Sequence, residues 1–329
     1  MRSLTYTIRN IKNGKNSYML SWLTFICIIV ILLSLDLGIF HKKDREIGFK
    51  ESLAMSAFYV LTGVTFGLWI WHIRGFDAFA LFITGFLVEK SLSLDNIFVI
   101  SIIFSSLSIP LKYQHRVLFW GILGVIILRG IMIGLGAQII SQFHWVLYVF
   151  SAFMLLTGIK MFFVPEKPLD PSKNPVLLWA RKHFNMTEAL HGQRFFVHQN
   201  DPQTQKRKLF ATPLFIALIT IECLDLVFAI DSIPAIFSLT QDTYIVYTSN
   251  IFAILGLRAL YFALAALIPK FYYLKYALAA ILIFIGSKIF IADTFGIMKI
   301  PPVLSLSVTL VLLGTGIVAS FIRDRHKKA

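Results

Sequence analysis

The sequence predicts an all-α, polytopic membrane protein with about nine transmembrane helices. Hydrophobic residues make up 57% of the 329-residue chain and charged residues only 15%, against about 45–50% and about 25% in soluble proteins. A helix of about 20 apolar residues crosses a hydrocarbon core that is ~30 Å thick. Nine segments of the chain qualify, namely 18–40, 53–71, 76–106, 117–138, 143–164, 211–238, 245–268, 272–292 and 303–322.

These segments leave too little polar chain for a separate soluble domain, so we expect one integral membrane domain over residues 1–329. The first segment has the basic flank of a signal peptide. It also contains Asp36 and lacks a small-residue cleavage site, so we expect it to be a retained span. Cys27 and Cys223 fall within predicted spans and form neither a zinc pattern nor a disulfide framework.

Basic residues outside the spans are shared unevenly between the two sides of the membrane. Counted with Lys160 and Lys275 at the ends of the adjoining spans, the loops after spans one, three, five and seven and the C-terminal tail hold 21 Lys and Arg, against 6 on the other side. The positive-inside rule places the larger set in the cytoplasm, with the N-terminus outside and the C-terminus inside. The net charge of +14 is then explained by topology and by attraction to anionic lipid. No motif indicates nucleic-acid binding.

The predicted cytoplasmic loop 165–210 is the largest polar segment. Its turn residues predict a short helix at 176–184 and a hairpin, with strands at 194–197 and 208–212 and a turn at 199–202. Three histidines also lie there, and scattered loop histidines are more often solvated than bound to metal. They are His183, His191 and His198.

Acidic residues stand inside two of the predicted spans. Residues 92–101 read LSLDNIFVIS and residues 222–231 read ECLDLVFAID. A charge at mid-membrane costs roughly 2.5 kcal/mol or more on insertion scales, so such residues are usually paired or functional. The candidate metal ligands in these two regions are Glu89, Asp95, Asn96, Glu222, Asp225 and Asp231.

The charges recur in two successive sets of three spans. The recurring residues are Asp95, Arg129 and Lys160 in repeat one (76–164), and Asp225, Arg258 and Lys288 in repeat two (211–292). Because three is odd, the copies must cross the membrane in opposite directions. Inverted repeats are typical of transporters whose substrate site lies near the midplane, where the copies meet. We therefore expect Asp95 and Asp225 to lie near each other; chance resemblance between apolar helices is the alternative.

Helical geometry indicates which polar groups can act together. On span three, one helix face carries Glu89, Ser93 and Asn96. On span six, one face carries Glu222, Asp225 and Ser232. Pro234 removes a helical hydrogen bond and frees the carbonyl of Ile230. A break or kink there could present a backbone oxygen beside Asp231.

The chemistry of these groups favours a hard cation. Carboxylate, amide and hydroxyl oxygens suit Mg²⁺, Ca²⁺ or Mn²⁺ rather than thiophilic metals. Because metal binding displaces protons, the same residues could support cation/proton exchange. Internal ion pairing is the alternative, and we expect the membrane bases to be structural counter-ions; they are Lys90, Arg129, Arg258 and Lys288. No nucleophile–base set or phosphate loop predicts an enzyme.

Several of these motifs resemble the TerC/Alx family. EKSLSLDN (89–96) and DLVFAIDSIPAIF (225–237) are highly specific, and the resemblance runs from about residue 30 to 322. It implies a bacterial inner-membrane protein of the LysE-type exporter superfamily, associated with manganese homeostasis and, by its older name, with tellurium resistance. The identity of the metal as manganese comes from the resemblance alone. The resemblance also implies the same six candidate ligands.

The sequence thus predicts an exporter that moves Mn²⁺ outward against protons, with Asp95 and Asp225 holding the ion and no permanently bound cofactor. Two alternatives stay open. One is export of another ion, such as Ca²⁺ or a tellurium oxyanion, and an anion would depend on Arg129 and Arg258. The other is a non-transporting scaffold whose cytoplasmic loop recruits partners. Beyond lipid and the cation, the sequence indicates no partner.

Overall fold

The computed structural model describes residues 19–35, 49–143, 145–163, 186–187, 190–200, 207–264, 272–294 and 301–326. Several predictions lie outside these residues, among them Asp36, His183 and the helix at 176–184. The side chains of Asp95, Asp231 and Arg258 lie outside the description as well. The chain forms two compact units, Met1–Arg45 and Glu46–Ala329. The first contains an apolar helix at Met19–Leu35.

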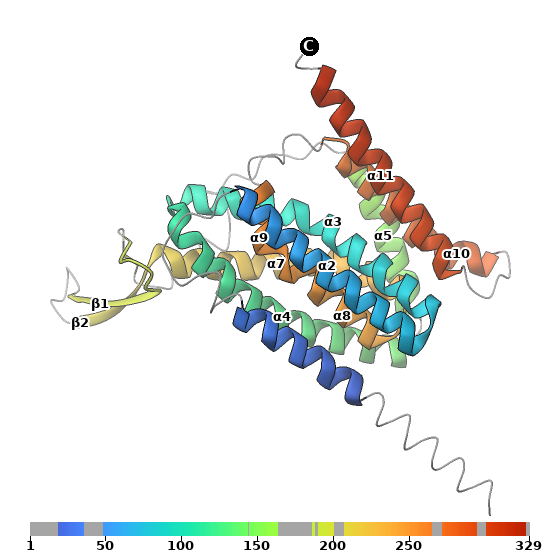
Figure 1. Cartoon of the computed structure of the whole chain (residues 1–329), viewed down its shortest axis with the longest axis horizontal. Helices are drawn as coiled ribbons and strands as arrows, with labels where there is room; N and C mark the ends of the chain where they lie inside the picture. The colour runs from blue at the N-terminus through green and yellow to red at the C-terminus, as the bar shows by residue number, and fades with distance from the viewer. Residues whose placement is uncertain are drawn as a thin grey trace, which may run out of the picture. The chain divides into compact units, whose positions relative to one another are not determined.

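The second unit is a helical bundle with one hairpin (Figure 1). Its elements in chain order are α2 (Phe49–Arg74), α3 (Phe76–Ser106), α4 (Leu111–Gln142), α5 (Val146–Phe163), β1 (Phe196–Asn200), β2 (Arg207–Ala211), α7 (Pro213–Leu239), α8 (Thr243–Leu255), α9 (Leu257–Leu264), α10 (Leu274–Thr294) and α11 (Pro302–His326). Helices occupy the described interior of all nine predicted apolar segments, with one interruption at Gly256.

Within the described residues, six helical segments are long and apolar enough to cross a membrane. They are α2, α4, α5, α7, the stretch Thr243–Phe262 of α8 and α9, and α11. α3 has 31 residues, but four of them are charged, namely Asp77, Glu89, Lys90 and Asp95. Charged residues at membrane depth face the bundle interior and find partners there. The neighbours of α3 therefore define the polar centre of the protein.

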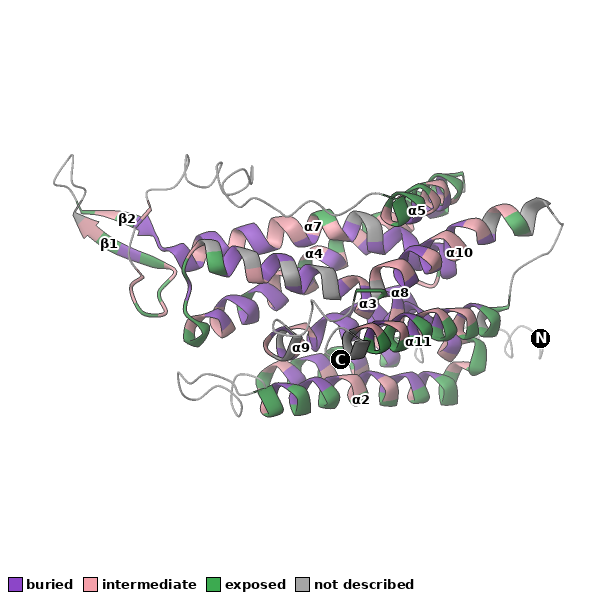
Figure 2. Ribbon diagram, turned by 90° about the horizontal axis from the view of Figure 1, so that it is seen from above, coloured by how far each residue is buried: buried purple, intermediate pink, exposed green. Residues whose placement is uncertain are grey.

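α8 and α9 lie in the interior of this bundle. In the apolar stretch Thr243–Phe262, 82% of the residues are buried, against 22% in α5. The two helices pack against α2, α3 and α4. Figure 2 shows the exposed faces on the outer helices, such as α2, α5 and α11. α8 begins at an N-cap, because the Asp242 carboxylate accepts a hydrogen bond of 2.9 Å from the Tyr244 amide.

The break in a membrane helix lies in a different span from the one that the sequence suggested. α7 continues through Pro234 as one helix, whereas the predicted span 245–268 divides at Gly256. A Cβ at residue 256 would lie 2.7 Å from Lys90 Nζ and 3.0 Å from Tyr59 Cβ. Glycine thus leaves room for two neighbouring side chains at the break. Proline is tolerated inside membrane helices because neighbouring groups satisfy the freed backbone.

α5 and α10 pack through two glycines that occupy equivalent positions in the predicted repeats. A Cβ at Gly158 would lie 2.8 Å from the carbonyl oxygen of Ala279, and one at Gly286 would lie 2.7 Å from that of Ser151. Ser151 and Ala279 are also equivalent positions, so each contact mirrors the other. Because the later part of each helix faces the earlier part of its partner, the two run antiparallel. Small residues permit this close approach of two backbones.

The predicted hairpin is confirmed, but the bounds of its first strand were wrong. β1 and β2 pair antiparallel, from Phe196 opposite Ala211 to Asn200 opposite Arg207. β1 therefore starts two residues after the predicted strand and includes Gln199 and Asn200, which had been expected in the turn. The cross-strand pairing of Gln199 with Lys208 holds these turn-favouring residues in extended conformation. Tertiary pairing outweighs local turn preference here.

Candidate functional site

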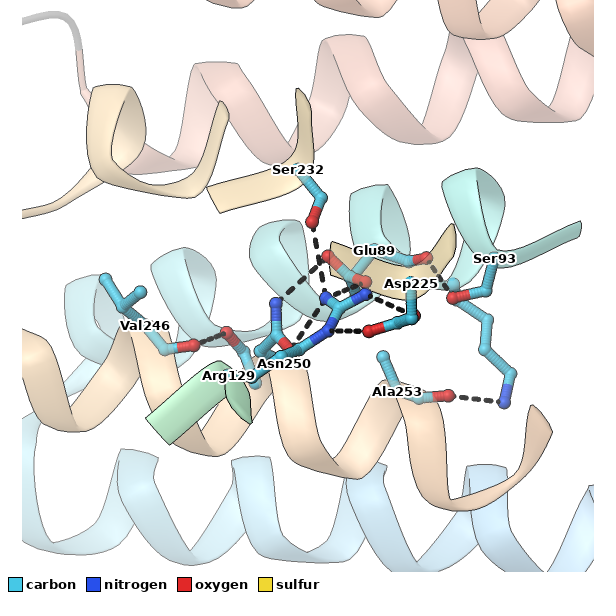
Figure 3. Close-up of polar contacts among 10 residues, drawn as sticks. Glu89, Ser93, Arg129, Asp225, Ser232, Val246, Asn250 and Ala253 are labelled. Carbon is cyan, nitrogen blue, oxygen red and sulfur yellow. Dashed lines mark hydrogen bonds and ion pairs between the residues drawn. The ribbon is translucent and has the colours of Figure 1, made fainter. Parts of the chain in front are cut away.

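The guanidinium of Arg129, on α4, is the centre of a buried polar cluster. Its side chain is 1% exposed. Arg129 Nε and Nη2 donate hydrogen bonds of 3.2 and 3.1 Å to the two carboxylate oxygens of Asp225 on α7. Figure 3 shows this fork between the two side chains. Two parallel bonds of this kind fix the orientation as well as the charge pairing.

Three further residues complete the coordination of Arg129 from other helices (Figure 3). Its Nη1 forms an ion pair with Glu89 on α3. The same nitrogen donates to Asn250 Oδ1 on α8 at 2.9 Å and to Ser232 Oγ on α7 at 3.2 Å. Asn250 Nδ2 in turn donates to the second Glu89 oxygen at 3.0 Å. Side chains from α3, α4, α7 and α8 thus form one network.

The charges in this network do not balance when both acids are ionised. Glu89 and Asp225 share a single guanidinium, and all three side chains are at most 10% exposed. Removing charges from water costs several kcal/mol each, roughly, unless pairing and hydrogen bonds compensate. Arg129 compensates one of the two carboxylates fully. With both acids ionised, one negative charge then remains that Arg129 does not balance.

Glu222 lies one turn before Asp225, apart from this network. Both of its carboxylate oxygens are buried and have no hydrogen-bond partner. The carboxylate rests on α4, where a Cβ at Gly124 would lie 2.5 Å from Glu222 Oε2. The glycine therefore leaves the space that the carboxylate occupies. A buried polar group without a partner is costly, which marks Glu222 as a second acidic position of functional interest.

An apolar cavity adjoins the network. Asn96 and Asp225 contribute polar side chains to it, and its volume is about 40 Å³. Its other lining residues are Val99, Ile100, Ile103, Leu118, Gly121, Ile122, Val125, Ile221, Leu224, Phe228, Ile254, Leu257 and Tyr261. The structure thus places the predicted ligands Asn96 and Asp225 at one cavity.

The two described lysines among the predicted counter-ions bind neutral groups. Lys90 Nζ donates to the Ala253 carbonyl near the end of α8 at 2.9 Å. Lys288 Nζ donates to Ser305 Oγ on α11 at 2.9 Å. Among the described side chains of the predicted counter-ions, Arg129 is the one that forms ion pairs with predicted acids. Arg258 lies outside them.

In the structure, Asp225 and Glu89 are both paired with Arg129. The sequence had predicted that Asp95 lies near Asp225. Asp95 and Asp231 belong to α3 and α7, but their side chains lie outside the described part. Among the described side chains, no three His, Cys, Asp or Glu residues form a cluster that could hold a metal ion. The acids that are described meet Arg129 instead.

Asn250 is the site residue that sequence reasoning missed. It is fully buried and bonds both Glu89 and Arg129. An amide within the apolar run of span seven was the available signal, since buried polar groups need partners. The repeat pattern drew attention to charges and left this neutral residue aside.

The fold and site define a multi-pass α-helical membrane protein with a buried charged centre. The model of the "Integral membrane protein TerC family" matches residues 74–328, and the chain belongs to this family. The match includes α3, α4, α7 and α8, which carry the network. The resemblance of the two motifs is thereby confirmed.

Bacterial relatives match nearly the whole chain. An "Uncharacterized membrane protein" of Rickettsia bellii is 52% identical over 304 residues, which cover 92% of this chain and 98% of the relative. "Uncharacterized membrane protein STKORF319" of Myxococcus xanthus is 48% identical over 305 residues, 93% of each chain. The "Putative membrane-bound redox modulator Alx" of Escherichia coli is 42% identical over 320 residues, 94% of this chain and 97% of the relative. No solved structure matches.

Proposed function

We propose that this protein exports a hard divalent cation, with Mn²⁺ as its principal substrate, across the bacterial inner membrane in exchange for protons. The observation that carries the proposal is the enclosure of Glu89 and Asp225 around one arginine inside membrane helices. Membrane acids of this kind are typical of ion pathways. The carboxylates and the Asn96 and Asn250 amides offer the oxygen ligands that such cations bind.

Arg129 has the role of a resident cation in this proposal. It neutralises the acids while no substrate is present, and a divalent ion must displace it from at least one carboxylate. Asp225 is the better placed to receive the ion, because it faces the cavity as well as Arg129. Asp95, Asp231 and Glu222 would complete the site or carry protons. The proposal includes no enzyme reaction and no permanently bound cofactor.

The proposal includes nine spans, an outside N-terminus, an inside C-terminus and an inverted repeat of spans three to five with six to eight. The mirrored contacts of Gly158 and Gly286 support the repeat. So does the antiparallel course of α5 and α10, since inverted copies cross the membrane in opposite directions. The site lies where α3 and α4 of one copy meet α7 and α8 of the other.

Flux through the purified protein tests this function directly. Proteoliposomes should transport Mn²⁺ in preference to Ca²⁺ and Mg²⁺, and faster with an opposing proton gradient. Asp225→Asn should abolish the flux, because it removes the carboxylate shared by cavity and arginine. Asp77→Asn, which changes an exposed acid in the first turn of α3, is the matched control and should keep full flux. Undiminished flux in Asp225→Asn would sink the assignment.

The same preparation separates the alternatives. A Ca²⁺ exporter would show the opposite metal preference, and an oxyanion exporter would move tellurite but no metal cation. A scaffold would show no flux, and its partners would depend on the β1–β2 hairpin. A redox role, as in the name of the Alx relatives, would require the thiols. Replacing Cys27 and Cys223 together should therefore leave Mn²⁺ flux unchanged if export is the function.

A further inference from the structure

The cavity beside the charged network extends to one side of it only. Its lining residues on α3 and on α8–α9 follow Glu89 and Asn250 in sequence, whereas those on α4 and α7 precede Arg129 and Ser232. All these helix segments lead to the same end of the bundle, where α4 and α7 begin and α3 ends. In the topology proposed above, that end is cytoplasmic.

Tyr261, on α9, lines the cavity near this end. Its side chain is buried, and its hydroxyl donates a hydrogen bond of 2.9 Å to Gln114 Oε1 on α4. The amide nitrogen of Gln114 donates to the carbonyl of Ile109, in the α3–α4 turn, at 2.8 Å. The phenol thus ties α9 to α4 and, through Gln114, to the α3–α4 turn.

α9 is the lining element whose movement would disturb the bundle least. It is a separate helix of 8 residues that begins after the break at Gly256. Lys90 binds the Ala253 carbonyl on the α8 side of that break. α8 is held further by Asn250 and by its cap at Asp242. α9 can therefore pivot at residue 256 while the hydrogen bonds within α8 stay intact.

The opposite end of the network is closed by different contacts. Arg74 at the end of α2 forms an ion pair of 2.8 Å with Asp242 at the start of α8. The Arg74 guanidinium also lies 4.5 Å from the centre of the Tyr244 ring. On this side the described residues pack as a buried cluster that includes Ile133, Ile236 and Val246. Because the cavity extends only toward the cytoplasmic end, an ion would enter the network from that end.

We propose that the Gln114–Tyr261 hydrogen bond is the cytoplasmic gate of the ion pathway. With the bond formed, the cavity is shut, and its apolar lining keeps it dry, as in hydrophobic gates of channels. When the bond breaks and α9 pivots, water and the cation reach Asn96 and Asp225. The identity of the ion rests on the function proposed above, but the gate does not depend on which cation passes.

Accessibility of the cavity tests the gate without any transport measurement. Val99, a buried residue of the lining, is replaced by cysteine in a protein in which Cys27 and Cys223 are replaced by serine and alanine. A thiol reagent with a fixed positive charge is applied to the cytoplasmic face of inside-out vesicles. Tyr261→Phe keeps the ring but removes the hydroxyl, and should raise the labelling rate about tenfold, the order expected for one lost hydrogen bond.

Tyr247→Phe is the matched control. It also removes a phenol that bonds across to α4, at the Ile126 carbonyl at 3.1 Å, but Tyr247 does not line the cavity. In the Tyr247→Phe variant, the cysteine at residue 99 should be labelled at the same rate as in the protein that keeps both tyrosines. Equal acceleration in both phenylalanine variants would mean general loosening and would overturn the gate, as would no acceleration in Tyr261→Phe.

Gln114→Leu gives a second, independent break of the same bond. It should also accelerate labelling, and the double variant should be slower than the product of the two single accelerations predicts, because both changes remove the shared Tyr261–Gln114 bond. Additive effects would show that the two residues act separately and would contradict the proposal. Because labelling needs no Mn²⁺, a failed gate is distinguishable from a failed export assignment, which the Asp225→Asn flux decides.

Discussion

If the proposed repeat holds, the α5–α10 contact and the Arg129 network use it in two different ways. In the α5–α10 contact, equivalent glycines meet equivalent backbone positions, and each half mirrors the other. In the network the halves differ. Arg129 lies on the continuous helix α4, whereas the corresponding span of the second half is broken into α8 and α9. The contacts of the α5–α10 pair are symmetric, whereas those of the Arg129 network are not.

This difference has a physical basis. Backbone contacts between helices depend only on shape, so both copies can use the same small residues. A cation site needs an unequal arrangement, because one base cannot lie midway between two sets of acids and bind both fully. Asp225 accepts two bonds from Arg129, whereas Glu89 also accepts from Asn250. In the proposed export, this asymmetry would give the cation a preferred carboxylate.

The largest expected effect comes from removing the base of the network. Arg129→Gln leaves Glu89 and Asp225 buried together without a cation, and breaking a buried pair in this way costs about 3–5 kcal/mol. Lys288→Gln is the control, because Lys288 bonds only a hydroxyl among the described side chains and a glutamine amide can replace that donor. It should cost less than about 1 kcal/mol.

Unfolding in mixed micelles at increasing SDS measures both free energies. If the lysine variant lost as much stability as the arginine variant, Arg129 would contribute no more to stability than a base that bonds one hydroxyl. The view that the buried network depends on its arginine would then have to be abandoned.

The second effect concerns the symmetric contact. Gly158→Ala and Gly286→Ala each place a methyl group within 3 Å of a facing backbone oxygen, and overpacking of this kind costs about 1–3 kcal/mol. Because the contacts mirror each other, the two losses should be similar. Gly134→Ala, where nothing lies within 4 Å, should be neutral or stabilising by up to about 1 kcal/mol through helix propensity. Clearly unequal losses at residues 158 and 286 would refute the mirrored packing.

Apolar runs predicted the helices because every backbone group in a bilayer must be satisfied within the chain. Charges inside those runs predicted Glu89, Arg129 and Asp225, since such residues need partners. The sequence did not identify the pairing itself. The meeting of Glu89 and Asp225 at Arg129 follows from the rotation of α3 against α4 and α7, which tertiary packing decides. The predicted approach of Asp95 to Asp225 stays a prediction.

The helix break illustrates the same limit. Pro234 has a strong local effect on hydrogen bonding, yet α7 continues through it. Gly256 is one of 19 glycines, and nothing local distinguishes it. Its importance comes from Lys90 and Tyr59, which approach it from α3 and α2. A contact between residues far apart in sequence leaves no signal in the local pattern.

The smallest expected effect concerns this break. In Gly256→Ala the new methyl group would lie 2.7 Å from Lys90 Nζ, so the flexible ammonium must leave the Ala253 carbonyl. The lost hydrogen bond costs about 1 kcal/mol, and the higher helix propensity of alanine returns up to about 1 kcal/mol. The net stability should therefore change little. The α8–α9 junction, however, loses the Lys90 hydrogen bond that holds the end of α8. Hydrogen exchange of the α9 amides should accelerate while that of the α4 amides stays constant, and unchanged exchange in α9 would show that Lys90 does not hold the break.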